Sequence, residues 1–95
     1  MNNKLLVEFI GTFVFLFVIM FFGKPLHIAV ALFLVIYFGG SISGGHFNPA
    51  VTVMKYANND VTSMEAGGYV VVQVLAGLAA LGAYRFLAEN RMLGL

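Results

Sequence analysis

The sequence predicts an all-α membrane protein with three transmembrane helices and one re-entrant half-helix. Hydrophobic residues make up 61% of the 95 residues and charged residues only 9%, whereas a soluble domain of this size is mostly surface and needs more polar residues. Three apolar stretches are candidates to cross a bilayer. A short polar segment, residues 43–52, lies between the second and the third of them.

The first two helices are expected at about residues 5–22 and 26–40, joined by a Gly23-Lys24-Pro25 turn. The first apolar run, broken by Glu8, is long enough to cross a bilayer. Lys4 before it resembles the start of a signal peptide, but the run is too long for one and no Ala-x-Ala-like site follows, so we expect it to be retained. The second run is short, and its continuation through Ile42 requires burial within protein.

The polar segment is expected to form a re-entrant loop and a half-helix at residues 41–56. Asn48 is a preferred N-cap residue, and Pro49 suits the first helical position. The helix would stop before Asn58-Asn59-Asp60 after rising about 12 Å, against about 30 Å of bilayer hydrocarbon. It therefore crosses only part of the membrane.

The third membrane helix is expected at about residues 64–87, which completes a single domain over residues 1–95. Glu65 near its start suits the positive end of the helix dipole. Small residues spaced to let helices approach closely follow at Ala76, Ala79, Ala80 and Ala83. This spacing fits general helix packing or a dedicated dimer face, and we favour general packing.

Three spans put the two termini on opposite sides of the membrane. Lys4 and Lys55 then share one side, and Lys24, Arg85 and Arg91 share the other. The basic residues are nearly balanced, so the positive-inside rule favours neither orientation. The chain is expected to be a multi-pass protein that can insert either way up.

Composition excludes several classes of function. A net charge of +1 without a basic patch argues against nucleic acid as a partner. The absence of cysteine excludes disulfides and thiolate metal sites. His27 and His46 have no convergent third ligand, and no nucleophile and base form a set. We therefore expect no metal, no other cofactor and no enzymatic activity.

The segment Ser43–Thr52, which reads Ser-Gly-Gly-His-Phe-Asn-Pro-Ala-Val-Thr, resembles the first signature loop of the aquaporin (major intrinsic protein) family. Glu8-Phe9-Ile10-Gly11-Thr12 and the pair Tyr69 and Gln73 also match patterns of that family. The resemblance covers nearly the whole chain, but only the N-terminal half of a usual member, with one Asn-Pro-Ala repeat. It implies a half-aquaporin inverted-repeat unit and a passive channel for water or small neutral solutes such as glycerol.

The loop carries the chemistry that such a channel needs, namely a polar strip on an apolar wall. An extended backbone at Gly44-Gly45-His46-Phe47 would leave its carbonyls unpaired by any ladder, and the resemblance implies that these four carbonyls accept hydrogen bonds from the solute. The Asn48 side chain can cap the half-helix through its oxygen and donate into the lumen through its NH2. The half-helix start at Asn48, Pro49 and Ala50 adds partial positive charge, which opposes cations.

Two side chains outside the loop are expected to hold it. Glu8 is a carboxyl within an apolar helix, where burial is costly and usually functional. The resemblance implies that it braces the loop by accepting backbone N–H groups; the alternative is an acid at the membrane interface. We expect Gln73 to be a hydrogen-bonding residue in the helix packing that assists this bracing. His46 is expected to pin the loop, with a proton relay as the lesser alternative, and His27 to be interfacial.

The sequence departs from the family at two filter positions. Val51 stands where the second half of a family member usually has Arg, and Ile28 stands where an aromatic is expected, so a narrow filter is not predicted. Two identical chains inserted oppositely could replace the two halves of a family member. We therefore expect an antiparallel homodimer in the lipid bilayer, alone or as four such dimers. The alternative is a non-conducting subunit or relic that needs a full-length partner.

Overall fold

The computed structural model describes residues 2–90, and Arg91 lies outside the described residues. Within this range the chain forms the helices α1 (Asn2–Phe21), α2 (Pro25–Ser43), α3 (Pro49–Ala57) and α4 (Ser63–Glu89). Helices α1, α2 and α4 are long and apolar enough to cross a membrane, whereas α3 has only 9 residues. The predicted class, three membrane helices and one half-helix, is confirmed.

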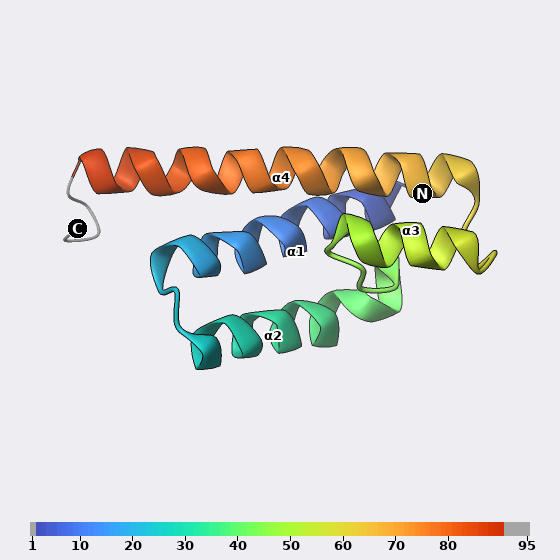
Figure 1. The fold of residues 1–95 in the computed structure, drawn as a ribbon, viewed down its shortest axis with the longest axis horizontal. Coiled ribbons are helices and arrows are strands. Elements are labelled where there is room, and N and C mark those ends of the chain that lie inside the picture. The colour runs from blue at the N-terminus through green and yellow to red at the C-terminus, as the bar shows by residue number, and fades with distance from the viewer. Residues whose placement is uncertain (1, 91–95) are drawn as a thin grey trace.

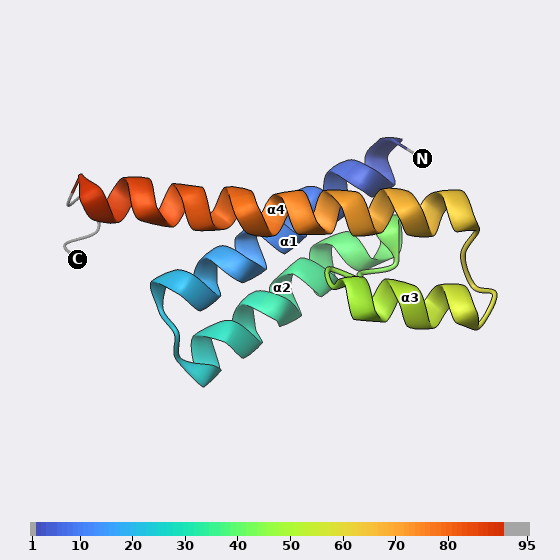
Figure 2. The same cartoon turned by 45° about the horizontal axis from the view of Figure 1, so that its top comes forward.

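Helix α1 packs against both α2 and α4, and α3 packs against α4. Figures 1 and 2 show that α1 and α4 run in the same direction and that α2 runs in the opposite direction. Helix α3 lies beside the first half of α4. Helix α1 begins and α4 ends at opposite ends of the molecule (Figure 1), whose longest dimension is 45 Å. This arrangement agrees with an odd number of spans.

Helix α2 is longer than the sequence indicated. The prediction ended it at about residue 40 and assigned residues 41–43 to the loop, but the helix continues to Ser43. Gly44 explains the difference, because its left-handed backbone (φ 93°) forms the C-cap and its N–H donates to the Gly40 carbonyl at 2.8 Å. The loop proper is therefore residues 44–48.

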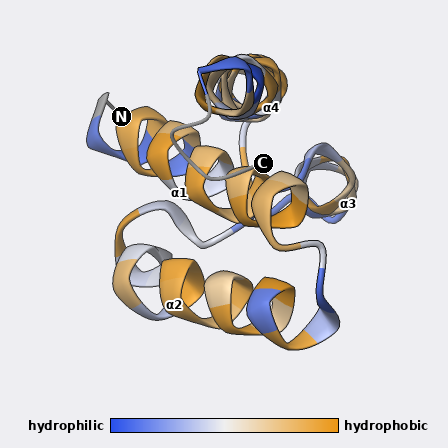
Figure 3. Ribbon diagram, turned by 90° about the vertical axis from the view of Figure 1, so that its left-hand side faces the viewer, coloured by the Kyte–Doolittle hydropathy of each residue, from blue (hydrophilic) through white to orange (hydrophobic). Residues whose placement is uncertain are grey.

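The interior of the bundle contains many polar side chains, whereas its exterior is largely apolar. The largest fully buried side chains are Tyr69, Phe47, Gln73, Glu8, Thr12 and Thr52. Large apolar side chains such as Leu26, Phe33 and Phe38 are exposed instead, and Figure 3 shows hydrophobic residues over most of α1 and α2. This distribution suits a bundle whose surroundings are lipid, because burial of apolar surface from water does not drive helix association there.

The small residues of α4 divide between its two faces. Ala76 and Ala80 are fully buried, and a Cβ added at Gly77 would lie 3.1 Å from a methyl group of Leu16 on α1. Ala79 is exposed. Within one chain, Gly77 thus lies close to α1, and Ala76 and Ala80 lie in the interior of the bundle.

Candidate functional site

A buried carboxylate, that of Glu8 on α1, lies at the centre of the site. One oxygen accepts hydrogen bonds from the Ser43 hydroxyl at 2.7 Å and the His46 backbone N–H at 3.1 Å. The other accepts from the Phe47 backbone N–H at 2.8 Å and the Gln73 side-chain nitrogen at 2.9 Å. Glu8 is fully buried, and these four donors satisfy it without a cation among its hydrogen-bond partners. The carboxylate thus connects α1 to the end of α2, to the loop and to α4.

A second set of contacts connects the loop to α3 and α4. The Gln73 nitrogen also donates to the Thr52 hydroxyl oxygen at 2.9 Å, and that oxygen lies 2.8 Å from Nδ1 of His46. The His46 ring meets the Tyr69 ring edge to face, with ring centroids 4.9 Å apart. The structure therefore brings together Glu8, His46 and Gln73, three of the predicted residues.

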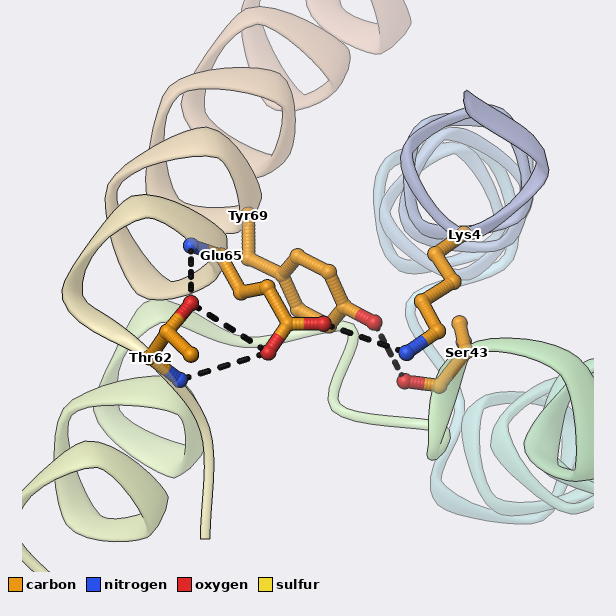
Figure 4. A network of polar contacts seen from close by, with 5 residues as sticks. All are labelled: Lys4, Ser43, Thr62, Glu65 and Tyr69. Atoms are coloured by element: carbon orange, nitrogen blue, oxygen red, sulfur yellow. Dashed lines mark hydrogen bonds and ion pairs between the residues drawn. The ribbon is translucent and has the colours of Figure 1, made fainter. Parts of the chain in front are cut away.

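Figure 4 shows how the N-terminal end of α4 is attached to α1 and α2. The Tyr69 hydroxyl donates to the Ser43 carbonyl at 2.6 Å. Lys4 and Glu65 form an ion pair of 3.1 Å between partly exposed side chains, and Thr62 and Glu65 form a capping box. The sequence prediction gave Glu65 only a role at the helix dipole.

Phe47 has an unusual backbone conformation for a bulky residue, with φ at 51°. Its side chain is 1% exposed and fits between α1 and α2 where both have glycine. A Cβ on Gly11 would overlap the Phe47 ring, and a Cβ on Gly39 would lie 3.2 Å from it. Tight packing of the ring, together with the bond from its N–H to Glu8, holds this conformation in place.

The four carbonyls of residues 44–47 accept no hydrogen bond from residues 2–90. The N–H groups of His46 and Phe47, by contrast, both donate to Glu8. The loop therefore offers acceptors that have no partner among residues 2–90, which is the arrangement that a solute-binding strip requires.

Asn48 lies at the start of α3 and is exposed. Its side-chain oxygen accepts from the Ala50 backbone N–H at 2.8 Å, with Pro49 in the first turn. Its side-chain nitrogen donates to no residue in the described range. An open hollow of about 360 Å³ adjoins this helix start and is lined by Thr12, Phe15, Asn48, Gln73 and Leu78, among others.

The two predicted filter positions do not meet within one chain. Val51 is half-buried in the first turn of α3. Ile28 is half-buried near the start of α2, about 24 Å along the helix axis from the loop at 1.5 Å per residue. His27, next to it, is exposed and stacks on Phe22 at the turn between α1 and α2. The described residues hold no group of three side chains suited to a metal ion.

Sequence reasoning gave no role to Ser43, Thr52 or Tyr69. All three are buried. Ser43 bonds to Glu8, Thr52 bonds to His46, and Tyr69 donates to the Ser43 carbonyl. For Thr52 the sequence offered a signal, because its hydroxyl lies one helical turn beyond Asn48 and so on the same face of the half-helix. Thr12 is also buried, and its hydroxyl has no partner in the described range.

Comparison with known proteins gives a consistent result. The model of the major intrinsic protein family matches residues 19–94. A glycerol uptake facilitator protein-like 6 of Lactiplantibacillus plantarum is 38% identical over 87% of this chain and 43% of its own length. An aquaporin Z of Photorhabdus laumondii is 33% identical over 97% of this chain and 46% of its own.

Nodulin-26 of Glycine max is 33% identical over 90% of this chain and 36% of its own length. The chain thus spans less than half the length of these curated relatives. No solved structure matches it significantly.

Proposed function

Because the chain belongs to the major intrinsic protein family, we propose that it forms a passive channel for water and small neutral solutes such as glycerol. With three helices of membrane-spanning length, this family member is an integral membrane protein. The proposed channel is built from two copies of the chain in opposite orientations. Relatives named as an aquaporin and as a glycerol uptake facilitator support both solute classes.

The observation that carries the proposal is the state of the loop backbone. The carbonyls of Gly44, Gly45, His46 and Phe47 accept no hydrogen bond within residues 2–90. The loop is nevertheless held by buried hydrogen bonds from the His46 and Phe47 N–H groups to Glu8, to which Gln73 also donates. Carbonyls held in this way can replace part of the hydration of a neutral solute without any further movement of the protein. Asn48 adds a donor beside them.

The proposed antiparallel pairing is supported by the position of Asn48 and by the charge balance. The chain spans less than half of its relatives, and the exposed Asn48 adjoins an open hollow of about 360 Å³. A twofold axis in the membrane plane would bring a second half-helix to this position, with Asn48 facing Asn48. The nearly balanced basic residues permit insertion in both orientations. Four such dimers could assemble further in the bilayer.

Selectivity in this channel would be broad among neutral solutes. Val51 and Ile28 supply neither the positive charge nor the aromatic ring of a narrow filter. Ions would be opposed by the two half-helix N-termini, which disfavour cations, and by an apolar lumen in which an ion cannot replace its hydration. We therefore expect glycerol to pass together with water.

The alternative is a half-channel subunit that conducts only with a full-length partner. The single Asn-Pro-Ala repeat and the absence of Arg at Val51 favour it. It differs from the homodimer in one measurable respect, because the purified chain alone would then be inactive.

The decisive experiment reconstitutes the purified chain alone in liposomes. Light scattering should show faster shrinkage in sucrose than protein-free liposomes give, and shrinkage followed by reswelling in glycerol. Shrinkage in glycerol without reswelling would contradict broad selectivity, and a potassium current would contradict the channel itself. No change in either gradient would favour the alternative.

A second experiment tests the orientation. The chain has no cysteine, so single cysteines introduced at Asn3 and at Asn90 can be labelled selectively. An antiparallel dimer requires each to be labelled from both sides of the membrane. Labelling of each position from one side only would exclude this dimer, even if flux were observed.

A further inference from the structure

The hydrogen bonds around Gln73 determine where its hydrogens point. The Glu8 carboxylate only accepts hydrogen bonds, so the group of Gln73 that faces it at 2.9 Å is the NH2. The same nitrogen lies 2.9 Å from the Thr52 hydroxyl oxygen. Both hydrogens of the amide are therefore used, one for each partner, and the Thr52 oxygen is an acceptor in this bond.

The hydroxyl hydrogen of Thr52 then has a single acceptor within the described residues. Thr52 is fully buried, and Nδ1 of His46, 2.8 Å from its oxygen, is the acceptor available to it in the described range. If Nδ1 itself carried the hydrogen, the hydroxyl would receive two donors and its own hydrogen would be buried without a partner, which is unfavourable. Nδ1 must accept, so the hydrogen of the neutral ring resides on Nε2.

We call the chain of hydrogen bonds from Glu8 through Gln73 and Thr52 to His46 the relay. We infer that this relay fixes the His46 ring as the Nε2–H tautomer, and that the Nε2–H group donates hydrogen bonds to the oxygen atoms of permeating molecules. Gln73 and Thr52 are the positioning residues. His46 thus contributes a side-chain donor in addition to its backbone carbonyl. The relay also accounts for a buried threonine and glutamine that the sequence left without a common role.

The surroundings of Nε2 agree with this assignment. Nε2 has no partner in the described range and is not among the buried unpaired atoms, which there are the Thr12 hydroxyl and the Gln73 side-chain oxygen. It faces the exposed Gly44, where an added Cβ would lie 3.4 Å from it. His46 is only 6% exposed, and the lack of a side chain on Gly44 keeps the Nε2 edge of the ring from being covered completely.

A donor here would lie beside the carbonyl strip of residues 44–47, so a water or a solute hydroxyl could accept from Nε2–H while donating to a carbonyl. This part of the inference rests on the proposed channel function. The tautomer does not, because it is set by contacts within one copy and can be measured without any flux.

The test is nitrogen-15 NMR of the histidine rings in the full chain reconstituted in lipid bilayers. The two ring nitrogens have distinct shifts when one is protonated and the other is not. The chain has two histidines, and a His27→Gln variant assigns the signals of His46. We expect a protonated Nε2 and an unprotonated Nδ1, with the other neutral tautomer below about one tenth of the population.

Thr52→Val removes the hydroxyl and keeps the shape of the side chain, and we expect its His46 signals to show at least a threefold larger fraction of the Nδ1–H form. Thr52→Ser retains the hydroxyl and should restore the wild-type spectrum. A wild-type ring with its hydrogen on Nδ1, a doubly protonated ring, or a Thr52→Val spectrum identical to wild type would overturn the relay. The wild-type spectrum decides the first two even if the valine variant does not fold.

The claim that the Nε2–H group of His46 donates to permeating molecules is tested by magnetisation transfer from water to this group in the same bilayers. We expect rapid transfer from water to this group. A correct tautomer without water contact would overturn the donor role of His46 and leave the relay standing. Absence of flux with a hydrated Nε2–H would instead count against the proposed conduction, so the two failures are distinguishable.

Discussion

Replacement of Glu8 by Gln exchanges one oxygen for an NH2 group at constant shape. If the NH2 takes the place of the oxygen facing Ser43 and His46, the Ser43 hydroxyl can turn and accept, but the His46 N–H faces another donor. If it takes the place of the other oxygen, the Phe47 N–H and the Gln73 NH2 group lose their acceptor instead. Either way one buried backbone N–H is left unsatisfied, at a cost of about 1–3 kcal/mol.

Glu8→Leu removes the acceptor for all four donors. The Ser43 hydroxyl can still donate to the Gly39 carbonyl, 3.4 Å away. Three buried N–H donors lose their acceptor, at a cost of about 3–9 kcal/mol if the same penalty applies to each, which is comparable to the whole stability of many domains. We therefore expect Glu8→Gln to assemble with reduced thermal stability and reduced water flux, and Glu8→Leu to fail to assemble. Thermal unfolding in detergent and liposome shrinkage measure the two effects.

The matched control is Glu89→Gln, the same chemical change at an exposed position near the end of α4. Its effect on stability should stay within about 0.5 kcal/mol. A Glu8→Leu variant that unfolds and conducts like wild type would refute the reasoning, since the loop N–H groups would then not depend on the carboxylate. Equal effects of Glu8→Gln and Glu89→Gln would refute it as well.

Three further predictions concern packing, capping and selectivity. Gly11→Ala should lower stability by about 1–3 kcal/mol because its Cβ overlaps the Phe47 ring, whereas Gly82→Ala, whose Cβ meets nothing within 4 Å, should not; equal thermal unfolding of the two variants would contradict this. Thr62→Ala should cost about 1 kcal/mol through loss of the α4 cap, and an unchanged unfolding midpoint would count against it. Val51→Arg should reduce glycerol flux more than water flux, because it narrows the mouth and adds donors; equal reduction in liposome assays would disprove this.

The fold class could be predicted because its signals are local. Apolar runs of membrane-spanning length, Gly and Pro at the first turn, and Asn48-Pro49 at a helix start each report on a few neighbouring residues. Glu8 stood out for the same reason, as a carboxyl within an apolar run. Its expected hydrogen bonds came from the resemblance to a family, not from the run itself.

The remaining features depend on contacts between distant residues. The end of α2 depends on the left-handed backbone of Gly44 and on Ser43 bonding to Glu8, and a run of Gly-Gly-Ser-Ile gives no sign of either. The order of hydrogens through Thr52 requires three elements to meet. Neither the conformation of Phe47 nor its fit against Gly11 follows from spacing in the sequence.

The sign of the charge on the bracing group determines what the loop can present. A carboxylate only accepts hydrogen bonds, so Glu8 holds the N–H groups of His46 and Phe47 and leaves the neighbouring carbonyls free. A lysine in its place would hold carbonyls instead and leave N–H groups for the solute, which would attract anions. In the proposed channel the free carbonyls oppose anions, and the N-terminus of α3 at Asn48 opposes cations. For the proposed channel we therefore expect the buried acid on α1 and the capped half-helix to favour neutral solutes over ions of either sign, even with Val51 at the position of an arginine.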